Sequence, residues 1–189
     1  DNFEKCFITK NNLIIDDRYI FQEEIIPKLI DGYKFDIRYF AVIVIFNDKI
    51  EIKHIPYAMV RLCSKKYSLK DEDLYSNLTN TSLNKDVNCT KSISKNDTEW
   101  TKCFEDMEKI TNDFFSNVIE EVGEDYFYKI NENSIASTRI IGFDFIISES
   151  DEMFILESNY APGDNTHYGS ECKDKVIKYY AEDIIKTII

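Results

Sequence analysis

The sequence contains little of what phosphate-binding loops, thiolate metal sites and membrane spans require. Only five glycines occur among 189 residues, and no G-x-G-x-x-G or P-loop spacing is present. The five cysteines include no C-x-x-C pair, which argues against a zinc site or a disulfide framework and favours reduced thiols in a cytoplasmic protein. The apolar run of residues 41–46 is far shorter than the roughly 20 residues that span a bilayer.

Positive charge is also scarce in this chain. Twenty-three Lys and Arg against 35 Asp and Glu give a formal net charge of -12 at pH 7. A surface of that sign repels phosphate backbones and anionic headgroups, so we expect neither nucleic acid nor a membrane as a partner. With 43% hydrophobic residues, the composition is that of one globular domain.

Strand signals fall into two groups along the chain. Apolar segments bounded by turn residues predict strands over residues 18–23, 35–46, 50–55 and 57–63, with Pro56 separating the last two. The polar stretch 64–97 predicts a long loop with one helical turn. Two apolar segments, 140–147 and 153–159, predict a hairpin across the polar turn 148–151.

Two helices are predicted in the second half of the chain. Apolar residues recur at three- and four-residue spacing from Trp100 to Val122, with a cap among residues 96–98 and an end at Gly123. The last helix is predicted over residues 171–188, with an inner face formed by Val176, Ile177, Tyr180, Ile184, Ile185 and Ile188. This order of elements favours an α+β fold over a regular βαβ alternation.

One chemical signal is a charged face on a strand that is otherwise apolar. Strand period two places Lys34, Asp36 and Arg38 on one face. A solvated edge with ion-paired neighbours is one interpretation. Because the same strand continues into a run that is apolar on both faces, we favour a cleft, where Arg and Lys suit phosphate oxygens and Asp suits a ribose hydroxyl.

A second signal is a pair of carboxylates that the hairpin brings together. Asp144 lies in an apolar strand, and Glu157 and Asn159 share one face of the predicted partner strand. Two carboxylates in apolar surroundings need a compensating cation, and such oxygen ligands suit magnesium held together with substrate phosphates. Alternatively, one acid is protonated or all three side chains face solvent. His54 and His167 are isolated, and we expect structural or surface roles for them.

Six stretches, in order, resemble the tubulin-tyrosine ligase family of ATP-grasp ligases. They are FQEEI (21–25), LIDGYKFDIR (29–38), RLC (61–63), NLTN (77–80), GFDF (142–145) and LESNYAP (156–162), with a Trp-led helix between the fourth and fifth. The resemblance covers about residues 18–189 and implies an ATP-grasp-like α+β fold, with a largely antiparallel sheet and packed helices. It also implies that residues 1–189 form a single domain without the family's N-terminal portion.

The resemblance assigns roles to individual residues. Those expected to bind ATP are Gln22, Glu23, Glu24, Ile25, Lys34, Asp36, Arg38, Thr79 and Asn80. The first four would bind adenine through main-chain atoms, Lys34 the base, Asp36, Thr79 and Asn80 the ribose, and Arg38 the phosphates. Those expected to bind magnesium are Asp144, Glu157 and Asn159. Arg38 and Arg61 are the implied catalytic residues, and Arg61 would hold a phosphate or the carboxylate of an incoming amino acid.

The implied function is an ATP- and magnesium-dependent ligase. ATP would phosphorylate a carboxylate of a protein substrate, and a free amino acid would displace the phosphate, as in tyrosination, glutamylation or glycylation of tubulin. The implied location is the cytoplasm, in association with the cytoskeleton. Two alternatives stay open. One is another ATP-grasp enzyme, such as a small-molecule ligase or an inositol phosphate kinase, and the other is a non-catalytic pseudo-ligase or binding fragment.

Overall fold

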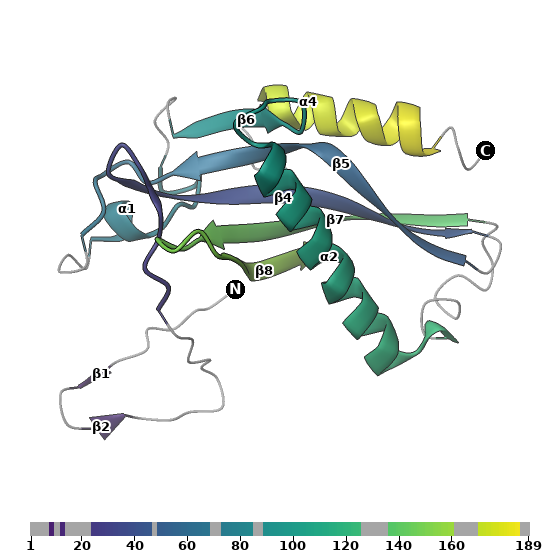
Figure 1. The fold of residues 1–189 in the computed structure, drawn as a ribbon, viewed down its shortest axis with the longest axis horizontal. Helices are drawn as coiled ribbons and strands as arrows, with labels where there is room; N and C mark the ends of the chain where they lie inside the picture. The colour runs from purple at the N-terminus through teal and green to yellow at the C-terminus, as the bar shows by residue number, and fades with distance from the viewer. Residues whose placement is uncertain are drawn as a thin grey trace.

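Long antiparallel strands form a sheet at the centre of the fold (Figure 1). The computed structural model describes residues 8–9, 12–13, 24–46, 49–68, 73–84, 89–125, 136–160 and 170–185. The strands of the sheet are β3 (Leu29–Ile30), β4 (Tyr33–Phe46), β5 (Lys49–Leu62), β6 (Thr90–Ser94), β7 (Ala136–Ile147) and β8 (Met153–Tyr160). Their order is β6-β5-β4-β7-β8, and β3 pairs with β4. Two short strands, β1 (Ile8–Thr9) and β2 (Asn12–Leu13), pair separately with each other.

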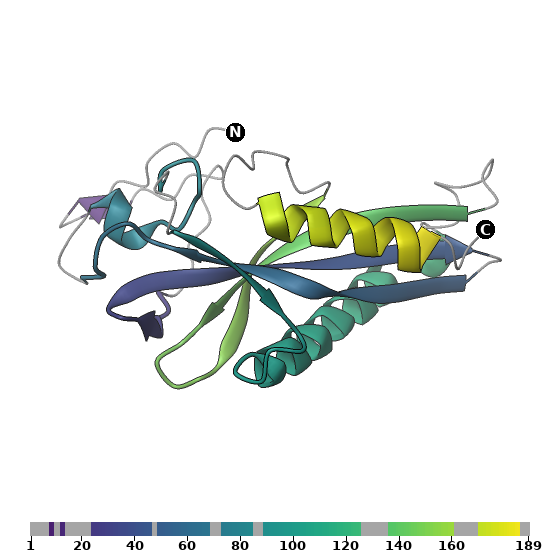
Figure 2. The same cartoon turned by 90° about the horizontal axis from the view of Figure 1, so that it is seen from above.

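Two helices lie on opposite faces of this sheet, as Figure 2 shows. α2 (Thr101–Val122) packs Phe104 and Met107 against Phe35, Ile37 and Tyr39 of β4. These three strand residues alternate with Lys34, Asp36 and Arg38, so the predicted division of β4 into an apolar and a charged face is confirmed. The charged residues therefore lie on the face opposite α2.

The other face is covered over part of its length. α4 (Ser170–Tyr179) continues into a π-helical turn, η1 (Tyr180–Ile184), and packs Cys172 and Val176 against Val42 and Val44 of β4. This cluster contains residues from the second half of β4, after Arg38. The first half of β4 on this face is left for the charged side chains.

Most of the predicted strands are confirmed, with one correction and one omission. The predicted break at Pro56 is wrong, because β5 is continuous and residues 55–57 form a bulge opposite Phe40. A proline is tolerated in a bulge, where it removes no regular ladder hydrogen bond. β6 is not evident from the sequence because Ile93 is its only buried residue. The predicted strand 18–23 lies outside the described residues.

The helices agree with prediction in position and differ in detail. α1 (Leu74–Asn77) is the predicted single helical turn, and α2 ends at Gly123, whose φ of 77° suits glycine. The predicted side-chain cap is wrong, because the Asp97 carboxylate accepts a hydrogen bond from the Ser94 N–H instead. Ile177 is 48% exposed rather than on the inner face of α4, whereas Val176 and Ile184 are buried. Ile177 follows Val176 by one residue, which turns its side chain by about 100° around the helix and out of the buried face.

Candidate active site

A buried ion pair joins β4 to β5 at the start of the charged face. Asp36 and Arg61 are direct neighbours across the strands. The Arg61 guanidinium donates two hydrogen bonds to the Asp36 carboxylate, at 2.6 and 2.5 Å. Thr79, from the loop after α1, donates its hydroxyl to the same carboxylate at 2.5 Å. The sequence predicted Asp36 and Thr79 to serve the same part of a ligand, and the structure brings them into contact.

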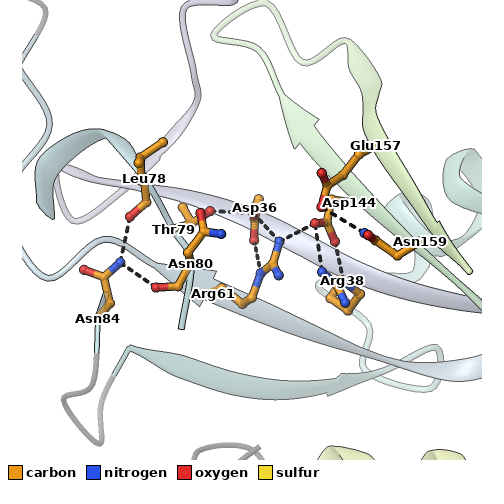
Figure 3. Close-up of polar contacts among 10 residues, drawn as sticks. All are labelled: Asp36, Arg38, Arg61, Leu78, Thr79, Asn80, Asn84, Asp144, Glu157 and Asn159. Carbon is orange, nitrogen blue, oxygen red and sulfur yellow. Dashed lines mark hydrogen bonds and ion pairs between the residues drawn. The ribbon is translucent and has the colours of Figure 1, made fainter. Parts of the chain in front are cut away.

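A second ion pair joins β4 to β7. Arg38 and Asp144 are cross-strand neighbours, and the Arg38 guanidinium binds both oxygens of the Asp144 carboxylate through Nε and Nη2. The Nη2 atom of Arg61 also lies 2.9 Å from the Asp144 Oδ2 atom. Arg61 therefore connects the two ion pairs into one chain of charges across three strands, as Figure 3 shows.

Burial makes the pairing of these charges obligatory. Asp36 and Asp144 are each 4% exposed and Arg61 is 7% exposed. Burial alone would raise the pKa of Asp144, but the hydrogen bond from Arg38 and the charge of Arg61 outweigh it and hold the pKa below its usual range. Burial would likewise lower the pKa of Arg61, and the Asp36 carboxylate reverses this effect and raises it. Asp144 is thus ionised at neutral pH, and the prediction that it needs a compensating cation is met here by two arginines.

A one-residue bulge in β8 turns Glu157 toward Asp144. Ile155 pairs with Phe145 and Glu157 pairs with Asp144, so Leu156 is the extra residue between them. In a regular hairpin Leu156 would face Asp144, and Glu157 would point to the opposite face. The bulge therefore places Glu157 and Asn159 on the charged face beside Asp144.

The three predicted metal ligands lie together but differ in exposure. Glu157 is exposed and accepts a hydrogen bond from Asn159 Nδ2 at 2.8 Å, whereas Asp144 is buried. The alternative that all three face solvent is therefore wrong for Asp144. No three His, Cys, Asp or Glu side chains gather into a metal-binding group within the described part of the chain. Two carboxylates and an amide oxygen fit magnesium, which takes its remaining ligands from water and phosphates.

The residues that directly follow the segment expected to bind adenine pair with the end of β7. Gln22 and Glu23 lie outside the described residues, and Glu24 and Ile25 lead into a main-chain pairing of residues 26–28 with residues 147–149. Lys34 lies on the same face as Asp36, with its ammonium group 6.0 Å from the centre of the Tyr67 ring. Asn80 is exposed next to Thr79. The candidate nucleotide residues that are described thus surround one end of the charged face.

An apolar pair on this face was not identified from the sequence. Ile146 and Phe154 are cross-strand neighbours, and strand alternation places Ile146 on the same face as Asp144. Ile146 is buried and Phe154 is 40% exposed. Strand periodicity in residues 140–147 could have revealed Ile146, whereas the position of Phe154 depends on the hairpin register. The pair places apolar side chains next to the Asp144 and Glu157 pair of the same two strands.

His54 lies away from the charged face. His54 shares hydrogen bonds with Tyr39 and Asn112, and burial lowers the pKa of the imidazole. These contacts agree with its predicted structural role, and His167 lies outside the described residues. A cavity of about 510 Å³ lies on the α2 face and is lined in part by Phe35, Val60 and Trp100. The candidate site is therefore defined by its charges rather than by this cavity.

Comparison with known proteins provides the remaining evidence. The sequence model of the tubulin-tyrosine ligase family matches residues 6–188, which is nearly the whole chain. No curated protein matches the chain. Within the described residues, no helix is both long and apolar enough to cross a membrane.

Proposed function

The chain belongs to the tubulin-tyrosine ligase family, and from this premise we propose that it joins a free amino acid to a carboxylate of a protein substrate, using ATP and magnesium. Membership supports an ATP-grasp-like ligase and the α+β architecture described above. The observation that carries the finer proposal is the chain of charges from Asp36 through Arg61 to Asp144 and Arg38. These side chains share one face, and they would serve a sugar, phosphates and a cation there.

The nucleotide would lie across β4, β7 and β8. Its base would pack on Ile146 and Phe154, next to main-chain atoms of Glu24 and Ile25 and the ammonium group of Lys34. Its ribose hydroxyls would reach Asp36, Thr79 and Asn80. A carboxylate is a strong acceptor for hydroxyl groups, and apolar side chains suit the faces of a purine ring. This placement would bring the base and the ribose next to the strand positions of Arg38 and Asp144, where the phosphates would bind.

The two arginines would stabilise the group that is transferred. Guanidinium groups donate paired hydrogen bonds to phosphate oxygens, and Arg38 and Arg61 are already fixed by their contacts with Asp144 and Asp36. Donors that are held in place before the reaction stabilise charge without reorganisation. Their arrangement supports phosphoryl transfer with little acid–base chemistry.

The proposed reaction has two steps. The terminal phosphoryl group of ATP moves to an oxygen of the acceptor carboxylate, which releases ADP and forms an acyl phosphate. The amine of the amino acid then attacks the carbonyl carbon, a C–N bond forms, the C–O bond to phosphate breaks, and the amine loses a proton to solvent. Magnesium, when bound, neutralises phosphate charge, and Asp144, Glu157 and Asn159 would hold it.

The identity of the acceptor rests on family membership. We propose a protein carboxylate of the tubulin type as the acceptor, with tyrosine, glutamate or glycine as the incoming amino acid, and a cytoplasmic location close to the cytoskeleton. The incoming carboxylate or a phosphate would bind Arg61, which pairs with Asp36 and also contacts Asp144 of the second ion pair.

Calorimetry with Mg-ATP and incorporation of labelled amino acid into tubulin test this proposal. The chain should bind Mg-ATP, and Asp144→Ala and Glu157→Gln should each weaken binding at least tenfold. Glu51→Gln, which changes an exposed carboxylate on β5, is the matched control and should bind normally. If wild type binds no ATP, the ligase proposal is wrong; binding without any label transfer would favour a pseudo-ligase.

A further inference from the structure

Asn84 is a buried polar residue that neither the sequence motifs nor the proposed reaction uses. It lies after the loop that carries Thr79 and Asn80, and only 1% of its surface is exposed. Buried amides are stable when their donors and acceptor are satisfied. The partners of Asn84 therefore show what its side chain holds in place.

The Asn84 side chain ties the loop to the end of β5. Its Nδ2 group donates to the Leu78 carbonyl at 2.6 Å and to the Asn80 carbonyl at 3.2 Å. Its Oδ1 atom accepts a hydrogen bond from the Ser64 N–H at 2.8 Å. Both donors of the amide and its oxygen are thus engaged, and Figure 3 shows the two donor contacts.

The two carbonyls held by Asn84 lie on either side of Thr79. Thr79 is itself buried and donates its hydroxyl to the Asp36 carboxylate. Each oxygen of that carboxylate also accepts one hydrogen bond from Arg61. A path of fixed contacts therefore runs from Asn84 through Thr79 to Asp36.

We propose that Asn84 is a positioning residue for sugar recognition, which holds residues 78–80 so that Thr79 orients the Asp36 carboxylate toward the ribose hydroxyls of ATP. This inference rests on the proposed nucleotide site. A purely structural Asn84 would affect stability and all nucleotides equally. A positioning residue affects the distinction between nucleotides with and without sugar hydroxyls.

The first test measures this distinction directly. Asn84→Asp keeps the size and the acceptor oxygen but replaces the donating Nδ2 group by an oxygen that would face two carbonyls. Binding of Mg-ATP, Mg-2′-deoxy-ATP and Mg-3′-deoxy-ATP is measured by calorimetry. Wild type should prefer ATP by about tenfold over at least one deoxy form, as expected for one charge-assisted hydrogen bond. The Asn84→Asp variant should bind ATP about tenfold more weakly than wild type. It should bind ATP and the deoxy form that wild type disfavours with equal affinity.

A matched control and a second variant make this experiment conclusive. Asn96→Asp makes the same change at an exposed residue in the turn between β6 and α2, and it should keep the sugar preference. Thr79→Val removes the hydroxyl from the path and should abolish the preference, whether or not Asn84→Asp folds. Full sugar preference in either Asn84→Asp or Thr79→Val, or a wild type that binds ATP without preference, overturns the inference.

The second test needs no nucleotide. A double-mutant cycle compares the unfolding constants of Asn84→Asp, Thr79→Val and the double variant. If Asn84 positions Thr79, the second substitution adds little to the first. The increase in the unfolding constant of the double variant should then be at least about fivefold smaller than the product of the two single increases. Independent effects would show that Asn84 does not position Thr79. A wild type that binds no ATP, combined with coupled effects, would instead refute the nucleotide site and leave the positioning of Thr79 intact.

Discussion

Arg61 contacts two carboxylates that come from different strands, and its shape allows this. A guanidinium presents several N–H donors in a fixed plane, so it can bind Asp36 through two hydrogen bonds and still reach Asp144. A lysine ammonium is a single charged point on a flexible chain. The residue type at this position therefore matters as much as its charge.

We expect Arg61→Lys to destabilise the protein by about 2–4 kcal/mol, because it leaves buried carboxylates without full pairing. Urea denaturation followed by circular dichroism measures the change. Arg139→Lys is the matched control, since Arg139 is exposed on β7, and it should change the free energy of unfolding by less than about 0.5 kcal/mol. An equal change in the free energy of unfolding for the two substitutions would contradict a special role for the contacts of Arg61 with Asp36 and Asp144.

The ionisation of Asp144 predicts how stability depends on pH. Its pKa is lower in the folded protein than the unfolded value of about 3.9. The stabilisation is therefore complete well above pH 3.9 and is lost as pH falls through that value toward the folded pKa. We expect the melting temperature of wild type to fall more steeply between pH 5 and pH 3 than that of Asp144→Asn. Parallel curves for the two proteins would show that Asp144 is not responsible.

At the scale of single elements, the bulge in β8 decides which side chains reach the site. A deletion within a strand normally shifts the register and sends every following side chain to the other face. Leu156 is the extra residue of the bulge, so its removal leaves Ile155 opposite Phe145 and Glu157 opposite Asp144. Deletion of Ser158 has no such compensation and would move Asn159 away from the charged face.

We therefore expect deletion of Leu156 to retain Mg-ATP binding within about tenfold, one factor of ten being 1.4 kcal/mol. Deletion of Ser158 should abolish binding. Calorimetry on the two deletion variants, with circular dichroism to confirm folding, makes the comparison. A folded Leu156 deletion that binds no nucleotide would show that the bulge contributes more than register.

Strands β4 and β8 show which parts of the site could be predicted from the sequence. Period two in β4 correctly predicted one face for Lys34, Asp36 and Arg38, because this property is local. The contact of Asp144 with Glu157 was also predicted, yet a regular hairpin would have separated them, and no sequence signal marks the bulge at Leu156. Asn84 could not be identified because its partners are main-chain groups, whose position depends on the folded loop.

At the scale of the whole molecule, the net charge of -12 limits which proteins can approach. Many of the lysines near the surface are already paired, as Lys28 is with Asp151 and Lys91 with Glu99. An acidic acceptor tail would therefore meet a repulsive field around this chain, even if its target carboxylate is attracted to the arginines.

We expect binding of a glutamate-rich acceptor peptide to strengthen as salt increases from about 0.05 to 0.3 M, because salt screens long-range repulsion. Fluorescence anisotropy with a labelled peptide measures the trend, and an uncharged peptide of equal length is the control. Binding that weakens with salt would instead indicate a local basic groove.

The bonds between Asp144 and the two arginines have a consequence for ligand order. The carboxylate that would bind magnesium is already neutralised by Arg38 and Arg61, so a free cation gains little by competing for it. Bound phosphates would add negative charge beside the two arginines, and a cation would then be attracted to the phosphates and the carboxylate together, which makes each ligand a condition for the other. We expect calorimetric titration with MgCl₂ alone to show no binding at millimolar concentrations, and titration in the presence of ATP to show strong positive cooperativity. The site would then be occupied only when the nucleotide and the metal are both present.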